Sequence, residues 1–599
     1  MISAQQKNQK QPMMAQRRRS HLCLLLMILL VFSEGRRCVA QTNPFKPTTE
    51  SPFRKKADSP FTPVPSDSND SSADQQDGAP QSNRPSRSAK KFRHGKYVPV
   101  KSPEGGWSYT PGQLTPLEYE PERVDVAEID FPERIKQFCV NRPGTLGAIT
   151  AQRPQGNTQI KVMDFLEGEV VASIVTPKEL LVLDVDDSGQ RLVLVSDKYG
   201  FGEKREIGTF LVNDSVLVEE SMFIPFPDLR VPDLDVVSAD FVGDHHLLIV
   251  SFSGRVSLWD LEKLREECGF DLNSRGSKIQ VVSGPDPDVV AFADKEQFGL
   301  FDIRRQEFLG VSPIPEGMTS PQIAVSPSGT RLVLAESEKA IVIDAINGQI
   351  QEEIPLPAGP LTRVEFANDD FLLVSSQSLI SISDRMLLWT YIGAENSVSV
   401  HGTTFFMMGG SSAKGTVIPK TLPDPQAVDA LETAHSQPDL FVVRPGDSVQ
   451  IDVSKVPSQF RPQVQAALEQ ALHDRELSVA DKSDVVMTAS ITGPEQKVVE
   501  YSQFGRGGGA SGYVVSEFVS TLEILWKGQV AWRKERTNAP GSITPKKGQS
   551  IQDILREKTS QPNLRLFAQA GFPRYVRKPE GKSAESKESL GQSNIEGLF

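Results

Sequence analysis

Short apolar runs separated by polar turns recur along the middle of this chain, over residues 138–418. The clearest unit is residues 320–357, in which the runs 331–335 and 340–343 have the length of strands and are rich in aliphatic and β-branched residues. Asn347-Gly348 follows the second run, and an Asn-Gly pair favours a tight hairpin turn. The unit therefore predicts four short antiparallel strands joined by three turns.

Repetition of this unit decides between two antiparallel folds, a β-propeller and a plain meander within a β-sandwich. Apolar entry strands begin at seven places, at roughly the 40-residue period of propeller blades. These places lie near Phe138, Leu180, Val236, Ile279, Gln322, Leu361 and Ser397. We predict a mainly β chain with a seven-bladed propeller over residues 138–418, with six or eight blades left open. The last unit is short, so we expect a strand from before Phe138 to complete the ring.

Several units carry residues typical of a known repeat family. The third unit contains Trp259-Asp260 at the end of a strand, and the next two units place Asp302 and Asp344 at the matching point. Residues 325–329 are close to the Ser-Pro-Asp-Gly turn of WD40 repeats, although the Gly-His pair of well-formed WD40 blades is lacking. The region thus resembles a degenerate WD40 propeller. The resemblance implies a rigid frame and does not name a ligand.

Residues 439–578 have a different pattern, in which helices interrupt the strands. One helix is expected over residues 462–472, where five apolar residues share one face with helical spacing; they are Val464, Ala467, Leu468, Ala471 and Leu472. We predict a small α/β sandwich domain with an antiparallel sheet. A Pro-containing linker over 419–438 is expected before it, and a disordered tail over 579–599 is expected after it.

The first 40 residues carry a targeting pattern. Three arginines at 17–19 precede an apolar run over 22–32, which is shorter than the ~20 residues needed to span a bilayer. Cys38-Val39-Ala40 loosely fits the small-x-small rule for cleavage. We expect a signal peptide over 1–40, with an uncleaved signal anchor as the alternative. The mature chain would be exported to a periplasmic, cell-envelope or secreted location, with no integral membrane span.

Two stretches separate this leader from the propeller. Residues 41–96 are dominated by polar residues and proline, and they cannot bury enough apolar surface to offset their ordering entropy, which predicts a disordered linker. Residues 97–137 add Trp107 and Tyr109 and are expected to lie along the propeller as an extended arm. The Arg-rich leader, the linker and the divergent blades together resemble exported proteins of planctomycete-type bacteria.

Charge and cysteine content narrow the possible partners. The 599 residues carry a net charge of −12, and a chain cut after Ala40 would carry −18. Nucleic acid as a partner requires a basic face, so the composition argues against it. After cleavage only Cys139 and Cys268 remain, in different predicted blades. We favour two buried free thiols, with one disulfide as the alternative, and the spacing fits no cysteine metal site.

A glycine-rich stretch is the first candidate for chemistry. Residues 507–512 satisfy the pattern G-x-G-x-x-G, which binds a dinucleotide only where it follows a strand and opens a helix. Here the chain continues as an expected strand, so no helix N-terminus is available for a phosphate. A hairpin loop explains the glycines better.

Two polar clusters are the remaining candidates. His245-His246 with Asp240 and Asp244 could ligate a metal, but adjacent residues of an extended chain point to opposite faces. Residues 184–189 (DVDDSG) lack the spacing of a calcium loop. Turns at the ends of strands explain both clusters better.

The sequence therefore predicts no catalytic, cofactor-binding or metal-binding residues, and no cofactor. We expect an exported, non-enzymatic interaction or scaffold protein whose propeller binds a protein or a cell-envelope polymer. Two alternatives stay open, a propeller-type hydrolase or lyase acting on polysaccharide or peptide, and a structural cell-envelope component. Clustered carboxylates or histidines at the propeller axis would favour the enzyme, whereas an apolar or featureless axis would favour binding.

Overall fold

The computed structural model describes residues 95–595, with gaps at 113–118, 127–133, 153–156, 178, 197–204, 214–215, 244, 338, 358–360, 410–414, 502–510, 539–548, 569–571 and 580–588. The signal peptide expected over 1–40 and almost all of the linker expected over 41–96 lie outside the described residues. Within the described ranges, the helices are too short or too polar to pass through a lipid bilayer.

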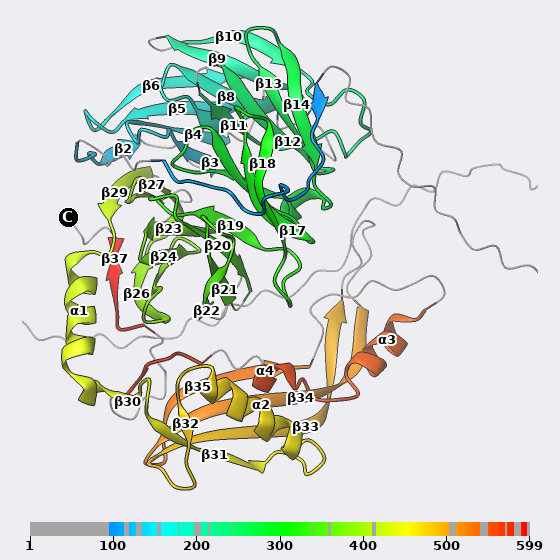
Figure 1. Cartoon of the computed structure of the whole chain (residues 1–599), viewed down its shortest axis with the longest axis vertical. Coiled ribbons are helices and arrows are strands. Elements are labelled where there is room, and N and C mark those ends of the chain that lie inside the picture. Colours follow the sequence, from blue (N-terminus) through cyan, green and yellow to red (C-terminus); the bar gives the residue numbers. More distant parts are fainter. Residues whose placement is uncertain are drawn as a thin grey trace, which may run out of the picture. The chain divides into compact units, whose positions relative to one another are not determined.

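Seven sheets, each built on four antiparallel strands, form a WD40-like β-propeller in the described part of the chain (Figure 1). We number these sheets as blades 1 to 7. Blade 1 contains β3 (Arg134–Val140), β4 (Leu146–Gln152), β5 (Thr158–Asp164) and β6 (Glu169–Thr176); blade 2 contains β7 (Leu180–Val185), β8 (Arg191–Ser196), β9 (Ile207–Asn213) and β10 (Val216–Phe223); and blade 3 contains β11 (Val236–Val242), β12 (His246–Ser251), β13 (Arg255–Asp260) and β14 (Arg265–Asp271).

The remaining blades repeat this order, with the first strand of each blade innermost. Blade 4 contains β15 (Gln280–Ser283), β16 (Val289–Ala293), β17 (Gln297–Asp302) and β18 (Glu307–Pro313); blade 5 contains β19 (Gln322–Val325), β20 (Arg331–Glu336), β21 (Lys339–Asp344) and β22 (Ile350–Pro355); blade 6 contains β23 (Val364–Asn368), β24 (Phe371–Val374), β25 (Ser378–Ser381) and β26 (Met386–Ile392); and blade 7 contains β27 (Ala394–Val400), β28 (Thr403–Met408), β29 (Gly415–Thr421) and β2 (Val124–Val126). A 3-10 turn over Gly276–Lys278 precedes blade 4. The predicted fold class, with seven blades, is confirmed.

Blade 7 is completed by a strand from the N-terminal side of the ring. Strand β2 pairs antiparallel with β29, with Val124 opposite Val417, and both valines of β2 are buried. At the inner side, β27 of blade 7 lies next to β3 of blade 1. The expected closing strand before Phe138 is therefore present, and the ring extends beyond the predicted 138–418, from β2 to Thr421.

The arm expected over 97–137 is partly built into the propeller. Strand β1 (Lys96–Tyr97) adds to the outer edge of blade 3 in parallel with β14. Further along, the Ser108 N–H donates to the Leu309 carbonyl at 2.7 Å, and the Trp107 indole N–H donates to the Ala345 carbonyl. Main-chain and side-chain hydrogen bonds thus fix this segment to blades 3, 4 and 5.

The linker expected over 419–438 contains a helix, which corrects the prediction. Helix α1 (Pro425–Ser436) begins at Asp424, whose side chain accepts the Gln426 N–H, and proline stands at its first position. The Tyr391 hydroxyl of blade 6 donates to Asp424 Oδ2 at 2.7 Å, and Ala427 is buried against blade 6. Capping and apolar packing therefore order a segment whose prolines had indicated a linker.

The region expected to be an α/β domain has one five-stranded sheet, in the order β32-β31-β33-β34-β35. Its elements are β31 (Ser448–Lys455), α2 (Arg461–His473), β32 (Ser478–Val479), β33 (Val485–Tyr501), β34 (Ser511–Trp526), β35 (Gln529–Thr537), α3 (Ile551–Lys558) and α4 (Arg565–Ala568), with a second pair formed by β30 (Phe441–Val443) and β36 (Val576–Arg577) after a 3-10 turn at Pro438–Leu440. The buried face of α2 contains Val464, Leu468, Ala471 and Leu472, as the spacing predicts. The prediction of an antiparallel sheet is wrong in part, because β31 runs parallel to both β32 and β33.

The disordered tail expected over 579–599 also needs correction in its described part. Strand β37 (Gly591–Asn594) adds to the outer edge of blade 6 in parallel with β26. Ile595 follows it and is buried in the apolar cluster of that blade. Backbone pairing, which does not depend on apolar side chains, therefore orders residues whose composition indicated disorder.

Candidate functional site

The innermost strands of the seven blades enclose a cavity of about 890 Å³. Every blade contributes to its wall, through β3, β7, β11, β15, β19, β23 and β27 or the residues next to these strands. We call this space the axial cavity. It is large enough for a small ligand or for a side chain of a partner.

Charged residues occupy one arc of the axial cavity. Blades 6, 7, 1, 2 and 3 contribute all of its charged and histidine side chains, which are Arg142, Asp184, Asp187, Asp240, Arg363, Glu365 and His401. Blades 4 and 5 contribute uncharged residues, among them Gln280 and Gln322. A ligand in the cavity therefore meets opposite walls of different polarity.

Two of these charges neutralise each other. Arg363 Nε lies 2.8 Å from Glu365 Oε1. The Ser397 hydroxyl donates to Glu365 Oε2 at 2.6 Å, and the Ser399 N–H donates to Oε1 at 3.3 Å. Since Glu365 is buried and its oxygens are satisfied, its hydrogen bonds with Ser397 and Ser399 hold blade 7 against blade 6.

Arg142 has unused hydrogen-bonding capacity. Its Nη2 donates to the Phe241 carbonyl at 3.4 Å, and its Nε lies 3.7 Å from Asp187 Oδ1. Its Nη1 is buried and has no hydrogen-bond partner among the described residues. Nearby, burial lowers the pKa of His401, so its ring is neutral at neutral pH. The Arg142 guanidinium thus has an unsatisfied donor in the wall of the axial cavity.

Asp184 and Asp240 form the most distinctive part of the axial cavity. Asp184 Oδ2 accepts a 2.8 Å hydrogen bond from the Phe241 N–H, while none of the described residues donates a hydrogen bond to the Asp240 carboxylate. Burial raises the pKa of Asp240 to about 6, although Arg142 and Arg363 act in the opposite direction. Burial, and then the charge of Asp240, raise the pKa of Asp184 well above its ordinary value. The two carboxyl groups are thus costly to ionise together unless a cation joins them.

The sequence does not single out this pair, and the structure shows why. Asp186 forms the turn expected for DVDDSG, because its Oδ1 accepts the Arg191 N–H at 3.0 Å. Asp184, two residues earlier, points into the axial cavity from β7, and Asp240 does so from β11. The available signal is one carboxylate within each of two otherwise uncharged, mainly apolar entry strands. The meeting of these strands at the axis depends on the closed ring.

The two adjacent histidines do not join Asp240. His245 Nδ1 lies 3.6 Å from Glu262 Oε1, whereas His246 Nε2 lies 3.3 Å from Glu267 Oε2. The two rings thus have separate partners, as the alternation of an extended chain predicts. Asp244 lies outside the described residues.

The glycine-rich stretch and the two cysteines are the remaining candidates from the sequence. Most of the glycine-rich stretch 507–512 lies outside the described residues, but Tyr501 and Ser511 on either side of it are antiparallel partners in β33 and β34. Cys139 and Cys268 are free and buried, as favoured from the sequence.

No family model matches this chain, and no curated protein matches it. Among solved structures, the β-propeller domain of Cps50 (Swd1) from Myceliophteria thermophila is similar, with 10% identity and a TM-score of 0.32 over 41% of this chain and 80% of that chain. Hsv2 from Kluyvelomyces marxianus is similar, with 8% identity and a TM-score of 0.32 over 42% of this chain and 70% of that chain. The propeller assignment stands on the seven sheets and their ring closure, not on these distant likenesses.

Proposed function

We propose that this chain is an exported interaction protein, and that its axial cavity binds a positively charged nitrogen of a protein or cell-envelope polymer. The observation that carries the proposal is the Asp184–Asp240 pair, in which Asp240 lacks a hydrogen-bond donor among the described residues. An ammonium group between two carboxylates removes their mutual repulsion and replaces lost water contacts with charge-assisted hydrogen bonds.

Arg142 adds a second requirement for the chemistry of the ligand. Its guanidinium belongs to the same cavity lining as the two carboxylates, so a ligand that carries an oxygen close to its ammonium group would complement both signs of charge in the charged arc. A lysine-containing peptide and an amino-sugar oligomer both have this chemistry. The uncharged arc at Gln280 and Gln322 would contact the neutral part of either ligand.

A hydrolase is the second candidate, and one observation favours it. Clustered carboxylates at the axis are the feature expected for the enzyme alternative, and a carboxyl group with a pKa of about 6 beside another carboxyl is suited to act as a general acid. Binding requires only the carboxylate pair, whereas hydrolysis also requires a positioned water or nucleophile. We therefore place binding first.

Direct binding measurements test the proposal. Lysine-containing peptides and chitosan oligomers are titrated into the full chain, and Asp240→Asn is expected to weaken binding by about tenfold or more, because it removes a charged acceptor. Asp429→Asn, which removes a carboxylate on the exposed side of α1 and outside the cavity lining, serves as the matched control and should bind as the wild type does. Equal affinity of wild type and Asp240→Asn would reject the site.

Two further measurements separate the remaining possibilities. Product analysis of each ligand after incubation distinguishes binding from hydrolysis, since the hydrolase alternative predicts cleavage that Asp184→Asn and Asp240→Asn abolish. For export, we expect the protein recovered outside the cytoplasm to begin at Gln41. An intact N-terminus in that fraction would contradict cleavage near Ala40.

A further inference from the structure

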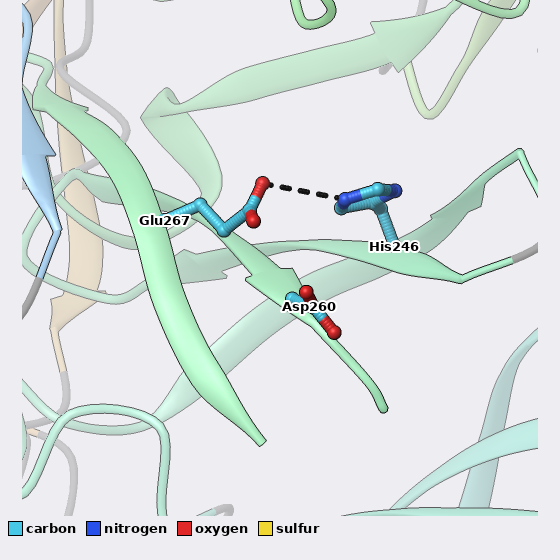
Figure 2. A group of neighbouring side chains, drawn as sticks. All are labelled: His246, Asp260 and Glu267. Carbon is cyan, nitrogen blue, oxygen red and sulfur yellow. Dashed lines mark ion pairs between the residues drawn. The ribbon is translucent and has the colours of Figure 1, made fainter. Parts of the chain in front are cut away.

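A second cluster of metal-ligating side chains lies in blade 3, outside the lining of the axial cavity. Figure 2 shows His246, Asp260 and Glu267 gathered around one point, with an ion pair between the histidine and the glutamate. One ligand atom from each of the three side chains lies within 4.8 Å of the other two. Asp260 is buried, and the other two side chains are half-buried.

Strand pairing brings the three side chains together. His246 opens β12 and lies directly opposite Asp260, the last residue of β13, so their side chains share one face of the sheet. Glu267 lies on β14 at a β-bulge, where Leu258 pairs with Cys268 and Trp259 pairs with Glu266. The bulge leaves Glu267 without an opposite residue, and bulges commonly redirect a side chain.

The repeated blade accounts for the aspartate. Asp260 Oδ1 accepts the Lys263 N–H at 2.9 Å in the turn after β13. At the matching points of blades 4 and 5, Asp302 accepts the Arg305 N–H at 2.7 Å and Asp344 accepts the Ile346 N–H at 2.8 Å. An aspartate in this turn is therefore part of the frame and by itself indicates no ligand.

The frame does not account for the histidine and the glutamate. The residue opposite the turn aspartate is Val289 in blade 4 and Arg331 in blade 5. The residue at the matching bulge is Leu309 in blade 4 and Gln351 in blade 5. Of these three blades, only blade 3 combines the turn aspartate with a histidine and a second carboxylate.

The site already attracts a cation. The Lys263 ammonium contacts Asp260 Oδ2, and the Lys263 side chain is 53% exposed. Because more than half of the Lys263 side chain is exposed, its ammonium group can return to solvent when another cation takes its place beside Asp260. A metal ion entering from solvent would therefore replace this ammonium group.

We propose that His246, Asp260 and Glu267 bind one divalent transition-metal ion such as zinc, with water completing its coordination. One imidazole nitrogen and two carboxylate oxygens form a donor set that zinc accepts, and three protein ligands leave one position open. Calcium and magnesium prefer shells of oxygen ligands, so the histidine selects against them. The site is independent of the ligand proposed for the axial cavity.

Metal titration of the full chain tests this site. After removal of metal by a chelator, zinc is titrated calorimetrically into the wild type, His246→Ala and His245→Ala. We expect His246→Ala to weaken zinc binding by about tenfold or more, because it removes the nitrogen ligand. His245→Ala, which alters the adjacent ring that faces Glu262, is expected to bind zinc as the wild type does. Equal zinc binding by wild type and His246→Ala would overturn the site.

Two further variants keep the result interpretable if His246→Ala is poorly folded. Glu267→Gln keeps the size of the side chain and removes its charge, and it is expected to weaken zinc binding. Lys263→Met removes the competing ammonium group and is expected to strengthen zinc binding. Unchanged zinc affinity in Glu267→Gln would overturn the proposal, as would weaker zinc binding by Lys263→Met.

Discussion

Trp389 on β26 donates its indole hydrogen bond to Ser593 on β37, with Nε1 and Oγ 2.8 Å apart. The two residues are separated by 204 positions in the chain. The parallel pairing of β37 with β26 also places Gly591 opposite Trp389. A segment near the end of the chain is thus an added strand of blade 6.

The contact between Gly591 and Trp389 gives the first prediction. A Cβ atom at position 591 would lie 2.1 Å from Trp389 Cζ3, so Gly591→Ala should displace β37 and destabilise blade 6 by about 1–3 kcal/mol. Hydrogen exchange of residues 591–594 should accelerate, as mass spectrometry would measure. Gly105→Ala is the control, because a Cβ atom there meets no atom within 4 Å. Unchanged exchange in Gly591→Ala would contradict the pairing.

Ring closure by β2 gives the second prediction. Val124 is fully buried, and Val124→Ala should reduce the free energy of unfolding by about 2 kcal/mol through lost apolar contacts and a cavity. Asp125 lies between the two buried valines and is exposed, so Asp125→Ala should change the free energy of unfolding by less than about 1 kcal/mol. Urea unfolding of both variants measures the difference. Similar effects of the two substitutions would show that β2 does not close the ring.

The third prediction concerns pH: because the pKa of Asp240 is raised, the free energy of unfolding of this protein should depend on pH. Because its pKa is about 6 in the folded protein against 3.8 ordinarily, the folded state holds this proton more tightly than the unfolded chain does. The contribution of Asp240 to stability therefore falls as pH rises from about 4 to about 6 and stays low above that. Asp240→Asn should raise the free energy of unfolding by about 1–2 kcal/mol at about pH 8 and have little effect near pH 4.

Denaturant titrations at both pH values would measure this effect. Asp429→Asn, on the exposed side of α1, is the control for loss of one carboxylate. If Asp240→Asn were destabilising at high pH, the carboxylate would have a stabilising partner.

Cys139 and Cys268 give a prediction about reactivity. Burial raises the pKa of Cys268 to about 12 and that of Cys139 well above its usual value. Since the thiolate is the reactive form, neither cysteine should be alkylated by iodoacetamide in the folded protein near pH 8. Both should react after denaturation, as peptide mass spectrometry would show at each position. Alkylation of Cys139 in the folded protein would indicate that the axial cavity opens to solvent around it.

The blades could be predicted from the sequence because each is a local antiparallel unit. In residues 320–357, apolar runs and turn residues are adjacent in the chain, so the pattern determines pairing as well as strand positions. The helix after Asp424 also had a local signal, because an aspartate before a proline is a typical helix start. The prolines at 419 and 423 favoured a linker instead.

Other features depend on contacts that the local pattern does not contain. The parallel pairing of β31 with β33 joins strands on either side of a helix, and β37 is a polar segment whose partner lies some 200 positions earlier. Asp184 and Asp240 come from different blades, and only the closed ring brings them to one axial cavity. The local sequence can mark such residues as unusual but cannot predict that they meet.

The closing pair of β2 and β29 also sets an order of events during synthesis. Residues 124–126 leave the ribosome almost 300 residues before their partners at 415–417. Six blades can form from consecutive hairpins, but blade 7 has no outer strand until β29 reaches β2. Throughout that interval β2 has no partner strand and the blades at the two ends of the open arc each have one uncovered face, which exposes the nascent protein to aggregation and to chaperones.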